Sequence, residues 1–243
     1  MRHLVAASVL LSTPAWALGP GSVAFIGYNA DGADDFAMVT LVNLSNQTIY
    51  FTDDETDGSG GKTTGEGAFQ WDTGADIIPA GTVIVFSSLT TAASASHGAL
   101  TEVDLGFNLA GAGDGILAYQ GPDQDTPTTF LAGIESQIGA AGNLTGTGLT
   151  NGLNFVTFTR GAHDDGGAYT ADRTGLASLS AYLPRINDRT RWDTASDDGI
   201  RFLPFDTSPF IATVAVPALP PLALALLAAG LGAVGARASR RED

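Results

Sequence analysis

The sequence predicts an all-β protein whose strands form a two-sheet β-sandwich over residues 18–215. Short runs of β-branched and aromatic residues alternate with clusters of Gly, Asp, Thr and Asn, which is the pattern of strands joined by turns. The chain has 31 glycines and no long helical period, so it lacks the crossover helices that an α/β fold needs.

The first three strands are predicted at residues 22–28, 36–43 and 48–52. The first strand ends at Asn29 to Gly32, a turn whose residues tolerate positive φ. The second is apolar from Phe36 to Val42, which indicates a central strand or one covered on both faces. Because a short polar segment separates the second strand from the third, we expect these two to form an antiparallel hairpin.

Five further strands are predicted at residues 68–71, 82–87, 115–120, 129–132 and 155–159. Turns are expected at 79–81 and 111–115, where Pro and Gly accumulate. One helix is possible at residues 176–183, and no internal linker divides the body.

The opening of the body carries a resemblance to a known type of domain. Residues 23–39, followed by 49–53, are similar to a domain common in secreted bacterial proteins, a β-sandwich of the lamin-tail-like, immunoglobulin type. Later segments that fit the same domain are 66–71, 113–121 and 186–188 with Trp192. The resemblance implies an extracellular module without established catalysis, and it transfers no active-site residue.

The amino terminus has the parts of a secretory signal peptide. Arg2 and His3 precede an apolar stretch, and Ala15-Trp16-Ala17 is the small-x-small pattern that signal peptidase cuts after. We therefore expect residues 1–17 to be removed on export, so that the mature protein begins at Leu18.

The carboxyl terminus, residues 216–243, carries a second signal. Val216-Pro217 is followed by a predicted transmembrane helix at about 220–236 and by a basic cluster, which consists of Arg237, Arg240 and Arg241. The uninterrupted apolar run is shorter than the roughly 20 residues that span a bilayer.

This order of parts resembles the Val-Pro variant of the PEP-CTERM class of sorting signals. The resemblance implies that an exosortase-type enzyme in the membrane removes the helix and leaves the body at the cell surface or outside a Gram-negative cell. A plain membrane anchor, with the tail retained, is the alternative, because it would share the helix and the arginines.

The composition limits the possible partners. The chain has 11 basic and 26 acidic residues; without the four arginines and two acids of the terminal segments, the body has 7 and 24, a net charge of −17. Such a body would repel nucleic acid, which proteins bind through lysine and arginine. The chain has no cysteine, so disulfides cannot stabilise it after export.

The strongest local motif for ion binding is Asp53-Asp54-Glu55-Thr56-Asp57-Gly58. Carboxylates at alternate positions before a glycine are typical of the first half of a calcium loop, and they predict a Ca²⁺ site built from Asp53, Glu55 and Asp57. An EF-hand would need a glutamate at position 64, where this chain has threonine. A solvated acidic turn is the competing interpretation, and it applies equally to residues 31–35, 163–167 and 197–199.

Catalytic motifs are scarce. There is no Gly-x-Ser-x-Gly, and after export only His97 and His163 would remain as histidine bases. Exposed aromatic side chains would bind polysaccharide, but burial in the core is the default for the candidates, which are Trp71, Tyr119, Tyr169 and Trp192. The sequence therefore favours an exported, non-enzymatic structural or adhesive protein. The alternatives are a secreted, cation-dependent hydrolase of polysaccharide or phosphoester and a permanently anchored envelope protein.

Overall fold

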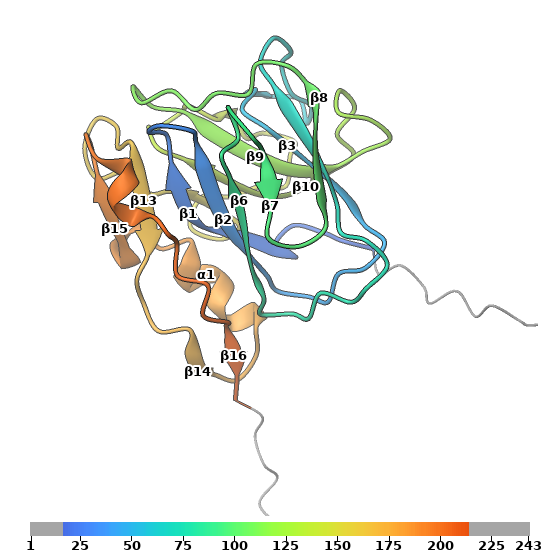
Figure 1. The fold of residues 1–243 in the computed structure, drawn as a ribbon, viewed down its shortest axis with the longest axis vertical. Coiled ribbons are helices and arrows are strands. Elements are labelled where there is room, and N and C mark those ends of the chain that lie inside the picture. The colour runs from blue at the N-terminus through green and yellow to red at the C-terminus, as the bar shows by residue number, and fades with distance from the viewer. Residues whose placement is uncertain (1–16, 214–243) are drawn as a thin grey trace, which may run out of the picture. The chain divides into compact units, whose positions relative to one another are not determined.

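The structure, a computed structural model, describes residues 17–213, and these form an all-β body with two six-stranded sheets (Figure 1). The first sheet has the order β15 (Trp192–Ala195), β13 (Gly166–Tyr169), β1 (Val23–Asn29), β2 (Asp35–Thr40), β6 (Val83–Ser87) and β7 (Ser94–Ala95). The second has the order β12 (Phe155–Thr157), β10 (Thr129–Glu135), β9 (Gly115–Gln120), β3 (Thr48–Thr52), β5 (Ala68–Asp72) and β8 (Ala99–Asp104). The all-β prediction is confirmed.

Aromatic side chains join the two sheets in one core. Phe36 of β2 meets Phe51 of β3 with ring centroids 5.0 Å apart. Trp71 of β5 meets Phe86 of β6 at 5.3 Å. Each pair takes one side chain from each sheet, so the inner faces pack against each other in a β-sandwich-like arrangement. Burying each large aromatic side chain removes roughly 150–250 Å² from water, which makes such contacts a main source of stability.

The central position predicted for the second strand is confirmed. Strand β2 lies between β1 and β6, and all six of its residues are buried. Strand β1 is also buried throughout, because the segment after β15 covers its outer face. A Cβ at Gly27 would lie 2.6 Å from the ring of Phe205, so only glycine leaves room for this covering ring.

The hairpin predicted between the second and third strands is wrong. Strand β2 belongs to the first sheet and β3 to the second, so the connection crosses from one sheet to the other. Leu44 in this connection is buried and forms an isolated bridge with Ile78. The apolar leucine therefore holds the crossover against the core, where a two-strand hairpin would have left it at a turn.

Smaller elements complete the body. Two short strand pairs join β4 (Thr56–Asp57) to β11 (Gly142–Asn143) and β14 (Thr174–Leu176) to β16 (Ile211–Ala212). The helical elements are η1 (Ser180–Tyr182), α1 (Leu183–Ile186), η2 (Arg189–Arg191) and η3 (Gly199–Phe202). The helix predicted at 176–183 is thus displaced and broken into single turns. No helix within residues 17–213 has the length and apolar character needed to cross a membrane.

Candidate functional site

The predicted calcium loop folds as a tight hairpin. The Asp57 carboxylate accepts hydrogen bonds from the backbone N–H groups of Ser59 and Gly61, at 2.7 and 3.0 Å. These bonds hold the pKa of the Asp57 carboxyl below its usual value. Gly58 and Gly60 have positive φ, so they turn the chain back without strain. The hairpin therefore satisfies Asp57 with its own backbone.

Asp53 and Glu55 have partners elsewhere. The buried Asp53 carboxylate accepts the N–H groups of Gly67 at 2.9 Å and Asn108 at 2.8 Å. Glu55 is exposed and accepts the hydroxyl of Thr63 at 3.0 Å. Within residues 17–213 no three Asp, Glu or His side chains are placed to hold a metal ion. The structure thus does not bring the three predicted ligands together.

A lysine, which sequence reasoning overlooked, pairs with one carboxylate of the acidic motif. The hairpin places Lys62 opposite Thr56, and the Nζ atom of Lys62 lies 2.6 Å from Oδ2 of Asp54. Both side chains are buried, with exposures of 0% and 2%. A second carboxylate, that of Asp125, lies 3.8 Å from the same Nζ atom. The one sequence feature that could have drawn attention to Lys62 is that it is the only lysine in the chain.

Three carboxylates, two of them buried, also fix the loop that precedes β9. Asp34 accepts the N–H of Leu109 at 2.8 Å, and Asp114 accepts that of Ala110 at 2.9 Å. Together with Asp53, which binds the neighbouring N–H of Asn108, they hold the loop at three successive positions. Burial raises the pKa of Asp34 to about 6 and that of Asp53 to about 8, although the N–H bonds oppose the shift. These acids provide hydrogen-bond acceptors for backbone N–H groups of the loop that would otherwise lack a partner.

The three other acidic turns lie together at one end of the body. Asp31 accepts the N–H of Gly199 at 2.6 Å, and Ala30 donates its N–H to the carbonyl of Asp165 at 2.7 Å. Burial, with the charge of Asp31 nearby, raises the pKa of Asp165. These contacts between the turns therefore involve backbone groups, and hydrogen bonding to backbone is what acidic residues ordinarily do in turns.

The two histidines of the described body lack a carboxylate partner, and the large aromatic candidates are buried. Within residues 17–213 neither histidine makes a hydrogen bond to a carboxylate, the contact that an acid–base pair requires. The four aromatic candidates for saccharide stacking are all buried, at exposures of 0 to 3%: Trp71, Tyr119, Tyr169 and Trp192. The default reading of these side chains as core residues is confirmed.

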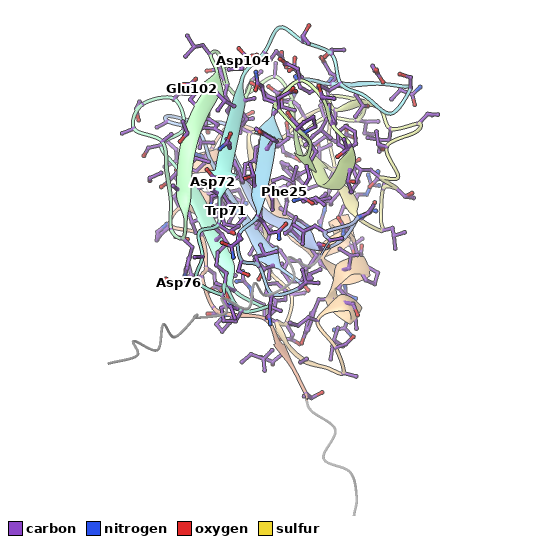
Figure 2. All side chains as sticks on the ribbon, turned by 90° about the vertical axis from the view of Figure 1, so that its right-hand side faces the viewer. Phe25, Trp71, Asp72, Asp76, Glu102 and Asp104 are labelled. Atoms are coloured by element: carbon purple, nitrogen blue, oxygen red, sulfur yellow. The ribbon has the colours of Figure 1, made fainter. Side chains whose placement is uncertain are left out.

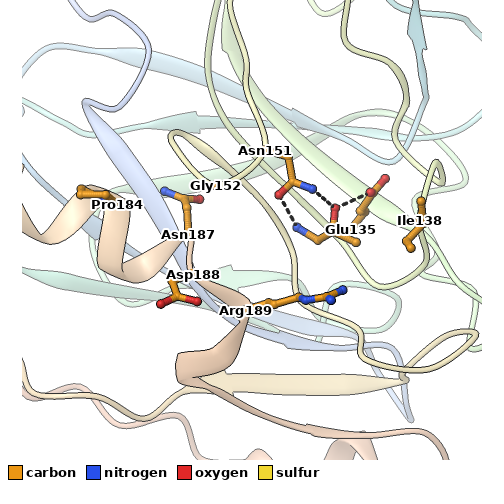
Figure 3. Close-up of a pocket in the computed structure, with 9 residues that line it drawn as sticks. Glu135, Ile138, Asn151, Gly152, Pro184, Asn187, Asp188 and Arg189 are labelled. Carbon is orange, nitrogen blue, oxygen red and sulfur yellow. Dashed lines mark hydrogen bonds between the residues drawn. The ribbon is translucent and has the colours of Figure 1, made fainter.

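A groove of about 600 Å³ lies between the edge of the second sheet and α1 (Figure 3). Its inner wall is a network around Glu135, which accepts the hydroxyl of Thr157 at 2.6 Å and the N–H groups of Gly139 and Ala141, each at 3.1 Å. The Nδ2 group of Asn151 donates to the Thr157 hydroxyl at 2.7 Å. All three of these hydrogen bonds to Glu135 come from groups of the wall itself, one to Oε1 and two to Oε2.

The opposite wall of the groove is more open. It is formed by Pro184, Asn187, Asp188 and Arg189, with Arg189 exposed. Ile138 sits at the rim with an exposure of 71%. The groove thus combines amide and carboxylate groups, one exposed arginine and an exposed aliphatic side chain.

Charge is distributed unevenly along the chain. All six arginines of the described body fall within residues 160–201, whereas 16 of its 24 acidic residues precede residue 160. Figure 2 shows Asp72, Glu102 and Asp104 along β5 and β8. Strand β8 pairs only with β5, so these carboxylates border a free sheet edge. Charge at such an edge discourages pairing with another chain.

The remaining predicted residues lie outside the described part of the chain. They are Ala15 of the signal peptide and Val216, Pro217, Arg237, Arg240 and Arg241 of the sorting signal; Ala17 is described and exposed. No protein-family model matches the chain, and no curated protein or solved structure matches it.

Proposed function

We propose that the protein is exported, processed at both ends and displayed at the surface of a Gram-negative cell or released from it, where it acts as a non-enzymatic structural or adhesive module. Signal peptidase would remove residues 1–17, and an exosortase-type enzyme would act at Val216-Pro217. The body would be an immunoglobulin-type sandwich of the lamin-tail-like kind, in keeping with its two facing sheets.

One observation supports this proposal most directly: the first and last described residues of the body are held by contacts within it. Leu18, the expected first residue, is buried against the core. At the other end Thr213 donates its N–H to Leu176 at 2.7 Å, beside the β14–β16 pair. Cleavage after Ala17 and near Val216 would therefore leave these contacts in place.

Substitutions in the tail test the sorting signal. In the native host, the wild-type chain is expected mostly at the surface or in the medium without its helix. A double variant, Val216→Ala with Pro217→Ala, is expected to accumulate full length in membranes, because the enzyme no longer recognises it. Cell fractionation, followed by immunoblotting with an antibody against the body, measures the location and the length of each protein.

Pro220→Ala is the matched control, since it changes a proline of the same tail outside the motif and should behave as wild type. Equal distribution of the double variant and the wild type would contradict sorting at Val216-Pro217. Retention of every form in membranes would favour the permanent anchor.

We place an adhesive contact at the groove beside α1, with extracellular polysaccharide as the partner. Arg189, which is exposed, can donate to sugar hydroxyls and carboxylates, and Ile138 offers an apolar surface. The hydrolase alternative receives less support here, because the groove's buried acid, Glu135, already accepts three hydrogen bonds.

Arg189→Ala is expected to weaken binding to the host's extracellular polysaccharide about tenfold, the effect of losing one charge-assisted hydrogen bond. Co-sedimentation at fixed ionic strength measures the loss. Arg185→Ala removes an equal charge from a neighbouring position that does not line the groove, and it should bind as wild type. If both substitutions weakened binding equally, the binding would depend on the overall charge of the protein, and the groove would not be the binding site.

A further inference from the structure

The pair formed by Lys62 and Asp54 is unusual in its enclosure. Its two side chains are buried at 0% and 2% exposure, with Nζ 2.6 Å from Oδ2. The hairpin turn fixes this approach, since Asp57 N–H bonds to the carbonyl of Gly61 and Thr63 N–H bonds to that of Glu55. A buried ion pair gains less from charge attraction than it loses in hydration, unless further contacts compensate. Reaction between the two groups requires one proton to pass from Nζ to the carboxylate across this contact, which gives an amine beside a carboxylic acid.

The groups around this pair match those that assist acyl transfer. Oδ1 of Asp54 accepts the backbone N–H of Glu66 at 3.1 Å, as an oxyanion would. The Thr52 hydroxyl lies 3.1 Å from Oδ2 and can donate to it as that oxygen leaves. The Asp125 carboxylate, 3.8 Å from Nζ of Lys62, can accept a proton from the attacking amine.

We propose that Lys62 and Asp54 react with each other to form an intramolecular amide bond. Nζ of Lys62 attacks Cγ of Asp54, and the new N–C bond replaces the bond from Cγ to Oδ2. Oδ2 departs as water, taking the carboxyl proton and one proton from the amine by way of Asp125. Charge balances, because an ammonium and a carboxylate become one neutral amide and water. No oxidant, metal or cofactor is required.

The resulting cross-link would tie the acidic motif to the Gly-rich hairpin. It would supply a covalent staple to a chain without cysteine. Prolonged contact in a fixed geometry is what lets such a reaction proceed without an enzyme. The inference depends only on the folded body and is independent of export and sorting.

The single lysine provides a direct assay. A lysine-specific endoprotease cuts the fully unfolded chain once, after Lys62, if the amine is free. We expect most of the unfolded wild-type protein to resist the cut. We also expect the peptide that contains residues 54–62 to be lighter than calculated by one water molecule, and Lys62 to stay unmodified by an amine-reactive reagent in denaturant. Cleavage into two fragments, with full labelling of Lys62 and the calculated peptide mass, would overturn the proposal.

Variants separate the amide from other dehydrations. Asp57-Gly58 can lose water by closing a succinimide, so a dehydrated peptide that persists in Lys62→Arg would also overturn the proposal. Asp54→Ala must restore cleavage after Lys62. This cleavage is measured on the unfolded chain, so the variant need not fold. Asp125→Asn keeps the pair and should slow its conversion after refolding by about tenfold or more, the usual scale for losing a proton acceptor.

Discussion

Replacement of Trp71 by alanine is expected to lower the free energy of unfolding by about 3–5 kcal/mol, a large part of the roughly 5–15 kcal/mol that stabilises a typical domain. Trp71 has an exposure of 0% and packs against Phe86 of the other sheet. Its indole N–H donates to the carbonyl of His97 at 2.7 Å. The substitution therefore opens a cavity between the sheets and leaves a carbonyl without its partner.

Urea denaturation of the body measures this loss. Trp71→Phe keeps most of the side-chain volume, so it should lower the free energy of unfolding by less. The remaining loss would come mainly from the missing hydrogen bond and a smaller cavity. Ile77→Ala, at a side chain with 66% exposure, should change the unfolding free energy by less than about 0.5 kcal/mol. If Trp71→Ala were as mild as Ile77→Ala, the indole would not join the two sheets as the structure has it.

Stability is expected to fall as the pH rises from 5 to 8.5. In the unfolded chain the carboxyls of Asp34 and Asp53 have the ordinary pKa of 3.8, whereas burial raises the pKa values in the folded protein to about 6 and about 8. Between these limits the folded state binds more protons than the unfolded state, so raising the pH removes stability. Each group contributes at most ~1.4 kcal/mol per pH unit within its own window.

The contribution of Asp53 is fully present below pH 3.8 and is lost by about pH 8, and beyond pH 6.5 Glu66 adds to the slope, because burial raises its pKa to about 7. Asp53→Asn has no charge to titrate and should make that part of the profile less steep. Asp76→Asn removes one acidic charge from an exposed position and should leave it unchanged. Stability that rises with pH would mean that Asp53 is ionised in the fold, held by the N–H groups of Gly67 and Asn108.

Strands with strong patterns could be located from the sequence. Strands β3 and β9 match the predicted residues 48–52 and 115–120 at both ends, since each is a mainly apolar segment between clear turns. Strand β13 was missed because it begins with two glycines. Packing explains why these positions are glycines: a Cβ at Gly166 would meet Gly199, and one at Gly167 would meet the ring of Phe158. Such contacts span long sequence separations that no local pattern contains.

The acidic motif was recognised as a feature, but its partners could not be predicted. Alternating carboxylates are equally compatible with an ion, with backbone caps and with a lysine. Asp53 finds its second partner in Asn108, 55 residues away, and Asp54 finds its partner after the glycine turn. Only the fold decides between these possibilities, and it assigns backbone to Asp53 and Asp57 and lysine to Asp54.

The intact mass of the protein recovered from its native host, taken separately from medium and envelope with peptide mapping of both ends, tests the central claim most directly. We predict a chain that begins at Leu18 and ends near Val216-Pro217, found at the surface or in the medium. A chain that still carries Asp243 and resides in the membrane fraction would contradict sorting and leave an anchored envelope protein.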